Sequence, residues 1–281
     1  MLLKQELSVK ISGKIKGRFI KMISRNLREK LSFLAEKYET PDFINNDPSK
    51  FMHQFSEQKD AEAVAFLAAN MAFGQRKQIL SHVDSILQVS GTDFVDWVQN
   101  EGYRSVFTKG DSSFYRVYTH DAMNSFFDTM KQILDTSGTL ENHFKAMYDQ
   151  KRVQTDCDKL YLAPVICNCF DKNCTLIPHG KDSACKKVNM FLRWMVRDNS
   201  PVDLGLWTWY GKENLLLPLD VHVMQEATNL GLLAPTSTGR VQSASMKNAV
   251  VLSNIASEIF PGDPAKLDYA LFGLGVDDSN S

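Results

Sequence analysis

A lysine at the predicted start of a helix, Lys186, is the first residue whose position suggests chemistry. It follows the Gly-containing turn 179–185 and opens the segment 186–197. The positive end of a helix dipole disfavours a cation, and an amine held next to such charge gives up its proton more readily, which frees it for nucleophilic attack. The same pattern fits an exposed lysine at a frayed helix end, so the spacing alone leaves both interpretations open.

An aspartate, Asp220, occupies the matching place before the next substantial predicted helix. It lies between the apolar run 215–219 and the segment 221–230, where its carboxylate would accept hydrogen bonds from backbone N–H groups. These hydrogen bonds and the helix dipole keep a carboxylate ionised, as is needed in a group that stabilises a developing positive charge. An aspartate that only caps the helix would give the same sequence.

The chain that must position these residues is predicted to be helical nearly throughout. No stretch alternates β-branched and polar residues for long enough to indicate a sheet, so the expected fold class is mainly α. Asp60 is the expected N-cap of a helix that ends near Gly74. The predicted helices are 60–73, 76–89, 121–134, 140–148, 186–197, 221–230, 245–259 and 263–272.

The predicted helix 186–197 separates into two faces. Helical spacing places one polar, basic stripe on it, formed by Lys186, Asn189, Arg193 and Arg197. The opposite face is apolar and is expected to be buried, with Val188, Phe191, Leu192 and Met195. Lys187 shares its side with Phe191 and Trp194, so it is the alternative nucleophile on a more buried side of the helix.

Composition and charge restrict the class of protein. The 281 residues are 43% hydrophobic and 23% charged, which is typical of a globular chain with a sizeable core. A formal net charge of -1 argues against a polyanion partner, but the average hides an uneven distribution. Residues 1–30 carry nine Lys or Arg against Glu6 and Glu29. This basic segment, 1–26, is interpreted either as an arm for a polyanion, lipid or partner helix, or as a solvated terminus.

The cysteines and the apolar runs indicate the compartment. The five cysteines lie within residues 157–185 at spacings that fit neither a disulfide framework nor paired metal knuckles, so free thiols and no bound metal are expected. They are Cys157, Cys167, Cys169, Cys174 and Cys185. The longest apolar runs are too short to cross a bilayer. We therefore expect a reduced, cytoplasmic protein with no membrane partner.

Two motifs carry a resemblance to a known family. The segments KKVNMFL and PLDVHV, at residues 186–192 and 218–223, resemble the Lys-x-x-Asn and Asp-x-His elements of the helix-hairpin-helix DNA glycosylases, which include endonuclease III and the 8-oxoguanine glycosylases. Over most of the chain after residue 27, the sequence is more closely similar to a bacterial family of unknown function related to these enzymes. The segments 185–197, 202–207 and 263–275 carry this closer similarity.

The resemblance implies a fold and a reaction. It implies a two-lobed helical region over 27–281, with one lobe of about 51–197, a second of about 27–50 plus 198–281, and a cleft between them. Lys186 would attack C1′ of a flipped nucleotide in damaged double-stranded DNA, with Asp220 stabilising the sugar cation. Base excision by a monomer in the bacterial cytoplasm or nucleoid, without a cofactor and with a possible AP-lyase step, is the implied function.

Further residues are implied to contact the DNA or the flipped base. By position they are Asn70, Gln75, Arg76, Asn189, Arg193 and His222. A helix C-terminus capped by Gly74 would account for residues 70–76 equally well. The aromatic side chains of Trp194, Trp207, Trp209 and Tyr210 could stack on bases, although aromatic residues at this density are more often core.

The sequence also departs from the glycosylase pattern. The family's hairpin reads Leu-Pro-Gly-Val-Gly, whereas residues 180–184 read Gly-Lys-Asp-Ser-Ala, and Asp182 would repel a phosphate. The connection between Lys186 and Asp220 is longer than in endonuclease III, and no four-cysteine cluster follows the last helix. A non-catalytic nucleic-acid-binding protein with the same fold is therefore the alternative function.

Overall fold

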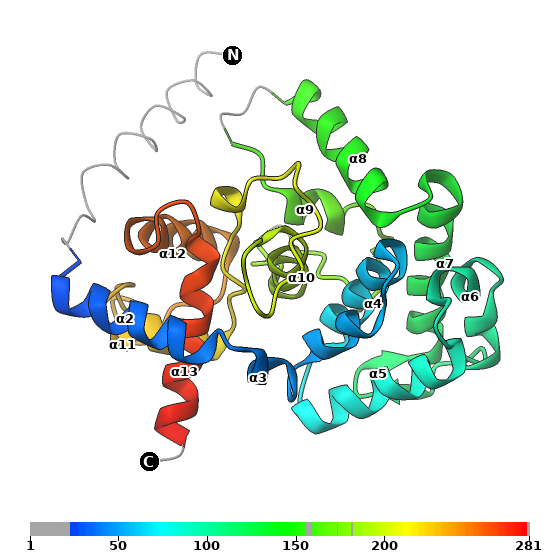
Figure 1. Cartoon of the computed structure of the whole chain (residues 1–281), viewed down its shortest axis with the longest axis horizontal. Coiled ribbons are helices and arrows are strands. Elements are labelled where there is room, and N and C mark those ends of the chain that lie inside the picture. The colour runs from blue at the N-terminus through cyan, green and yellow to red at the C-terminus, as the bar shows by residue number, and fades with distance from the viewer. Residues whose placement is uncertain (1–22, 156–158, 173, 181, 280–281) are drawn as a thin grey trace.

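Helices dominate the part of the chain that the computed structural model describes, residues 23–155, 159–172, 174–180 and 182–279 (Figure 1). The expected mainly α fold class is confirmed. Most of the predicted basic segment, residues 1–22, lies outside the described residues. The chain is first described just before α2 (Arg25–Tyr38), whose N-cap Ser24 accepts a hydrogen bond from Leu27 N at 3.2 Å.

The helices follow one another along the chain, with longer connections before α10 and before α12. After α2 come α3 (Pro41–Ile44), the 3-10 helix η1 (Pro48–Gln54), α4 (Gln58–Met71), α5 (Arg76–Ser90), α6 (Phe94–Gln99), η2 (Gly102–Ser105), α7 (His120–Ser137), α8 (Leu140–Gln154), α9 (Leu162–Cys167), α10 (Lys186–Val196), η3 (Lys212–Asn214), α11 (Val221–Asn229), α12 (Met246–Ile259), η4 (Pro264–Lys266) and α13 (Leu267–Ser279). All eight predicted helices are present, with ends shifted by up to seven residues.

One small sheet was not predicted. The strands β1 (Ser113–Tyr115) and β2 (Tyr118–Thr119) pair antiparallel in a tight hairpin. Strands this short contain too few residues to show an alternating pattern, which is why the sequence did not indicate them.

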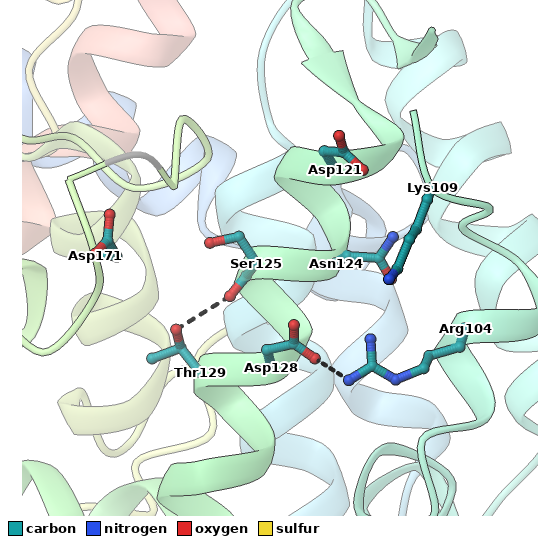
Figure 2. Close-up of a pocket in the computed structure, with 8 residues that line it drawn as sticks. All are labelled: Arg104, Lys109, Asp121, Asn124, Ser125, Asp128, Thr129 and Asp171. Atoms are coloured by element: carbon teal, nitrogen blue, oxygen red, sulfur yellow. Dashed lines mark hydrogen bonds and ion pairs between the residues drawn. The ribbon is translucent and has the colours of Figure 1, made fainter. Parts of the chain in front are cut away.

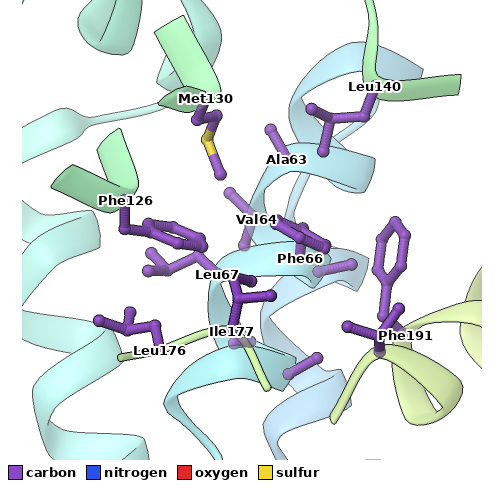
Figure 3. Packing of buried hydrophobic residues seen from close by; sticks show 14 of the residues in the cluster. Ala63, Val64, Phe66, Leu67, Phe126, Met130, Leu140, Leu176, Ile177 and Phe191 are labelled. Carbon is purple, nitrogen blue, oxygen red and sulfur yellow. The ribbon is translucent and has the colours of Figure 1, made fainter. Parts of the chain in front are cut away.

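A large hydrophobic core surrounds α4. Nearly every residue of this helix is buried, because its run of alanines and apolar side chains offers no polar face. Figure 3 shows Phe66 and Leu67 of α4 among side chains from α7 and α10, and the rings of Phe66 and Phe191 lie 5.0 Å apart, edge to face. This packing fixes α10 against the rest of the large core.

The prediction that Asp60 caps the N-terminus of α4 is wrong. The N-cap is Glu57, and Asp60 lies within the first turn with its carboxylate directed into the protein. There Asp60 accepts a hydrogen bond from the backbone N–H of Val95, the second residue of α6, at 2.7 Å. A buried acceptor therefore joins two helices where the sequence indicated only a local cap.

A second, smaller core holds α2, α11, α12 and α13 together, and Figure 1 shows these helices gathered on one side of the molecule. Gly273 of α13 lies so close to Tyr38 of α2 that a Cβ at this position would collide with the ring. The division into two lobes stays a prediction, because the residues of the two cores do not separate at residue 197. Ala184 packs into the smaller core, and Ala265 packs into the large one. Trp207, Tyr210 and Leu215 pack into the large core, although they follow residue 197.

The far end of α10 carries a buried ion-pair network. Arg193 and Arg197 are 3% and 2% exposed, so the predicted basic stripe is not a surface feature beyond its first residue. Arg197 pairs with Glu39 at 2.8 Å, with Asp263 at 2.8 Å and with Asp203. Arg193 pairs with Asp203 at 3.3 Å and with Asp268. Because these carboxylates come from other segments, the network joins α10 to α2 and α13.

Candidate active site

The turn before α10 sets the position of Lys186. Ser183 N donates to Gly180 O at 3.0 Å, and Cys185 follows in the left-handed conformation, with φ 48°. Asn189, one turn into α10, donates from its side chain to Ala184 O at 2.8 Å. Met246 N, at the start of α12, donates to Asp182 O at 3.0 Å. The turn is thus anchored to both α10 and α12.

Asp220 lies at the N-cap of α11, as predicted. One carboxylate oxygen, Oδ1, accepts from Val223 N at 2.9 Å. The other, Oδ2, lies 2.8 Å from the amine of Lys186. The structure therefore brings together the two residues that the motifs single out, each at the N-terminal end of a helix and 34 positions apart in sequence.

The contacts of Asp220 determine the charge state of its carboxylate. Burial alone would raise the pKa of Asp220, but the ammonium of Lys186, its hydrogen bond, the Val223 N–H and the nearby His222 together hold the pKa below its ordinary value. The side chains of Lys186 and Asp220 remain 36% and 30% exposed. An ionised carboxylate and an amine at hydrogen-bond distance are therefore accessible from the surface.

Lys187 points the other way. Its amine donates to Asn70 O at 3.1 Å, to Tyr118 Oη at 3.1 Å and to Leu176 O. Burial lowers the pKa of Lys187 to about 8. The neighbouring lysine is therefore held inside the large core by carbonyl and phenol oxygens, on the more buried side that the helix spacing predicts.

The residues implied near a flipped base are not gathered at the pair. Asn70 is fully buried and donates to Phe66 O, one turn back in α4, at 2.9 Å. Gln75 and Arg76 are exposed at the start of α5, with the Arg76 guanidinium 5.3 Å from the ring centre of Phe272. Among the contacts of the described residues, none joins Gln75 or Arg76 to Lys186 or Asp220.

Two of the implied DNA-contacting residues are inside the protein. Asn189 is 2% exposed and holds the turn before Lys186, so it positions the amine. Arg193 is ion-paired with two carboxylates and stacks over Tyr269 at 4.4 Å, which leaves it no surface for a phosphate. His222 differs from both, because it is exposed on the first turn of α11 beside Asp220.

The aromatic residues considered for stacking are largely core. Trp194 and Trp207 are fully buried, and Trp207 Nε1 donates to Glu62 at 2.9 Å. Tyr210 is 5% exposed, and Trp209 is partly buried next to Tyr148. Burial raises the pKa of Glu62 to about 7. The aromatic side chains therefore stabilise the large core and the segment that connects α10 to η3.

A polar cavity of about 380 Å³ lies over α7 and η2 (Figure 2). It is lined by charged and amide side chains, including Lys109, Asp121 and Asn124. Within it Arg104 Nη2 pairs with Asp128 Oδ1 at 2.8 Å. Neither Lys186 nor Asp220 lines this cavity. The charges of Arg104 and Asp128 within it already neutralise each other.

Neither a metal-binding cluster nor a membrane-spanning helix is found among the described residues. These residues contain no group of three or more His, Cys, Asp or Glu side chains arranged to hold a metal ion. They also contain no helix long and apolar enough to span a bilayer. The four cysteines that the structure describes are free thiols, as predicted, while Cys157 lies outside the described residues.

Sequence spacing does not identify several acidic residues around the site. The arginines of α10 form ion pairs with the carboxylates of Asp203, Asp268 and Glu39. The charges of Lys186 and Asp220 also influence the pKa of Asp268. Two arginines spaced by four residues on an amphipathic helix do indicate a need for carboxylates if they are buried. The acidic partners are distant in sequence, so spacing does not identify them.

Comparison with known proteins adds a family. A family model described as "Protein of unknown function (DUF2400)" matches residues 47–277. No curated protein and no solved structure matches the chain significantly.

Proposed function

The chain belongs to this family of unknown function, DUF2400, and from its site we propose that it is a DNA N-glycosylase that excises a damaged base from double-stranded DNA. One observation carries the proposal. The amine of Lys186 and the carboxylate of Asp220 lie 2.8 Å apart at the N-terminal ends of two helices, both partly exposed. The proposal includes a lyase step, a monomer, no cofactor, and a location in the bacterial cytoplasm or nucleoid.

The chemistry begins at the sugar. The neutral amine of Lys186 attacks C1′ of the flipped nucleotide, and the bond from C1′ to the base nitrogen breaks, so that the base leaves with the bonding electrons and takes up a proton. The lysine nitrogen, now bonded to C1′, gives one proton to the departing base. The C1′–O4′ bond then breaks as the sugar ring opens, O4′ takes the second proton from the nitrogen, and an imine results. Hydrolysis of the imine, or loss of the 3′ phosphate by β-elimination before hydrolysis, would release the enzyme.

Asp220 suits the second role in this reaction. Its lowered pKa keeps it ionised at neutral pH, and a negative charge near C1′ stabilises the positive charge that grows on the sugar. The same carboxylate is in contact with the amine that must lose a proton before attack. Both functions require that the N-cap hydrogen bond to Val223 N keeps the carboxylate in place.

Reductive trapping tests the proposal. We expect borohydride to link the wild-type protein covalently to at least one duplex from a panel in which each carries a single damaged base. Lys186→Gln should abolish the adduct, whereas Asp220→Asn should reduce the rate of base release by about 100-fold. If no duplex on a broad panel yields an adduct or a released base, the proposal is wrong.

One observation favours a second candidate function, a nucleic-acid-binding protein without catalysis. Asp182 is exposed in the turn before α10, and its charge opposes a phosphate beside Lys186, so nucleic acid bound elsewhere on the protein would not reach the amine. Under this function, duplex binding with a steep salt dependence would persist without any trapped adduct. Under the glycosylase proposal, Asp182→Gly should strengthen binding and leave trapping intact.

A further inference from the structure

A second group of reactive side chains lies directly behind Lys186, in a cavity of about 420 Å³. Two thiols line it, Cys167 from the last turn of α9 and Cys185 from the residue before α10. The helices α9 and α10 pack against each other (Figure 1), and both cysteines line the same cavity. Both cysteines are 4% exposed and neither is in a disulfide.

The pKa values of the two thiols are shifted in opposite directions. The hydrogen bond from Cys167 and a further one from Ser183 lower the pKa of Cys185, despite burial that opposes them. The reciprocal hydrogen bond and burial raise the pKa of Cys167. Two cysteines that line one cavity and whose thiol pKa values are shifted in opposite directions form the arrangement in which one sulfur attacks an oxidant and the other resolves the product.

A small oxidant can enter and be held in this cavity. Exposed residues, Asn168, Lys172 and Gly180, line it together with the thiols, so it reaches the surface. The Nε2 atom of His179, which also lines the cavity, is buried and has no hydrogen-bond partner among the described residues. A polar guest the size of a hydroperoxide would find a hydrogen-bonding group there.

We infer that Cys185 and Cys167 form a redox-active pair that a small hydroperoxide oxidises to a disulfide. The Cys185 thiolate attacks one peroxide oxygen, the O–O bond breaks, and hydroxide leaves and takes up the proton that Cys185 had given up, so that a sulfenic acid and water result. Cys167 sulfur then attacks the sulfenic sulfur, the S–O bond breaks, and hydroxide leaves with the Cys167 proton as a second water. The two sulfurs lose two electrons and the peroxide gains them.

The disulfide would tie the residue before Lys186 to α9. Because Cys185 occupies the left-handed position that starts α10, a covalent bond there fixes the helix end that carries the candidate nucleophile. The inference concerns the thiols and the cavity, so it does not depend on the proposed glycosylase activity, and its test uses no DNA.

The test maps the disulfide by mass spectrometry in the full-length Cys157→Ser protein, which keeps the pair intact. The reduced protein is treated with hydrogen peroxide in modest excess, denatured in N-ethylmaleimide and digested. We expect a cross-linked peptide that contains Cys167 and Cys185. Cys169 and Cys174, whose pKa values burial raises to about 11, should remain alkylated.

Two variants sharpen the result. Adding Cys167→Ser should remove the cross-link and leave Cys185 as a sulfenic acid that dimedone captures, whereas adding the control Cys174→Ser should leave the cross-link unchanged. Equal alkylation of Cys167 and Cys185 with and without peroxide in the Cys157→Ser protein would overturn the inference. A cross-link that involves Cys169 or Cys174 in place of either partner would overturn it as well.

Discussion

The two ends of α10 hold their cations in opposite ways. At its start, Lys186 meets one carboxylate, Asp220, and about a third of each side chain stays exposed. Near its end, Arg193 and Arg197 meet four carboxylates and are almost fully buried. The sequence presents all three as one basic stripe. The difference shows that the start of the helix leaves an ion pair accessible at the surface, while its end uses charge to join the two cores.

The largest expected effect concerns the buried end. Arg197→Met should destabilise the protein by about 3 to 5 kcal/mol, because it leaves buried carboxylates without their main partner. Urea unfolding followed by circular dichroism measures this. The control, Arg25→Met, breaks a pair whose side chains are 90% and 60% exposed and should cost less than about 1 kcal/mol. Equal losses in both variants would contradict a structural role for the network.

A smaller effect concerns Lys187, the buried lysine that follows Lys186. The folded-state pKa of Lys187 is lowered to about 8, so the unfolded chain binds more protons above that pH and the Lys187 contribution to stability should rise with pH. Between pH 7 and 9.5 wild type should gain about 1.5 to 2 kcal/mol relative to Lys187→Met. Parallel stability curves for the two proteins over this range would show that the amine is not buried as described.

A third effect separates the two functions of Asp220. Asp220→Ala loses both the charge and the cap of α11 and should cost about 1 kcal/mol of unfolding free energy, whereas Asp220→Asn keeps a capping side chain and should cost less. Base release should fall in both variants. If stability and base release fall together only in Asp220→Ala, then Asp220 acts as a cap and not as a catalytic group.

Local patterns predicted much of this structure, and long-range partners account for most of what they missed. The apolar periodicity of α5 and α7 and the N-cap pattern at Asp220 depend on neighbouring residues, so the sequence indicated them correctly. Asp60 fits a local cap pattern, whereas its partner in the structure, Val95 N, lies 35 positions away. The burial of Arg193 was missed for the same reason, since Asp268 lies 75 positions away.

We propose that the amine of Lys186, and not that of its buried neighbour Lys187, attacks the sugar. The most direct measurement is peptide mapping of the protein after borohydride trapping on a damaged duplex, which locates the sugar remnant on one lysine. We expect the remnant on Lys186, with trapping preserved in Lys187→Met and lost in Lys186→Gln. A remnant on Lys187, or undiminished trapping by Lys186→Gln, would contradict it.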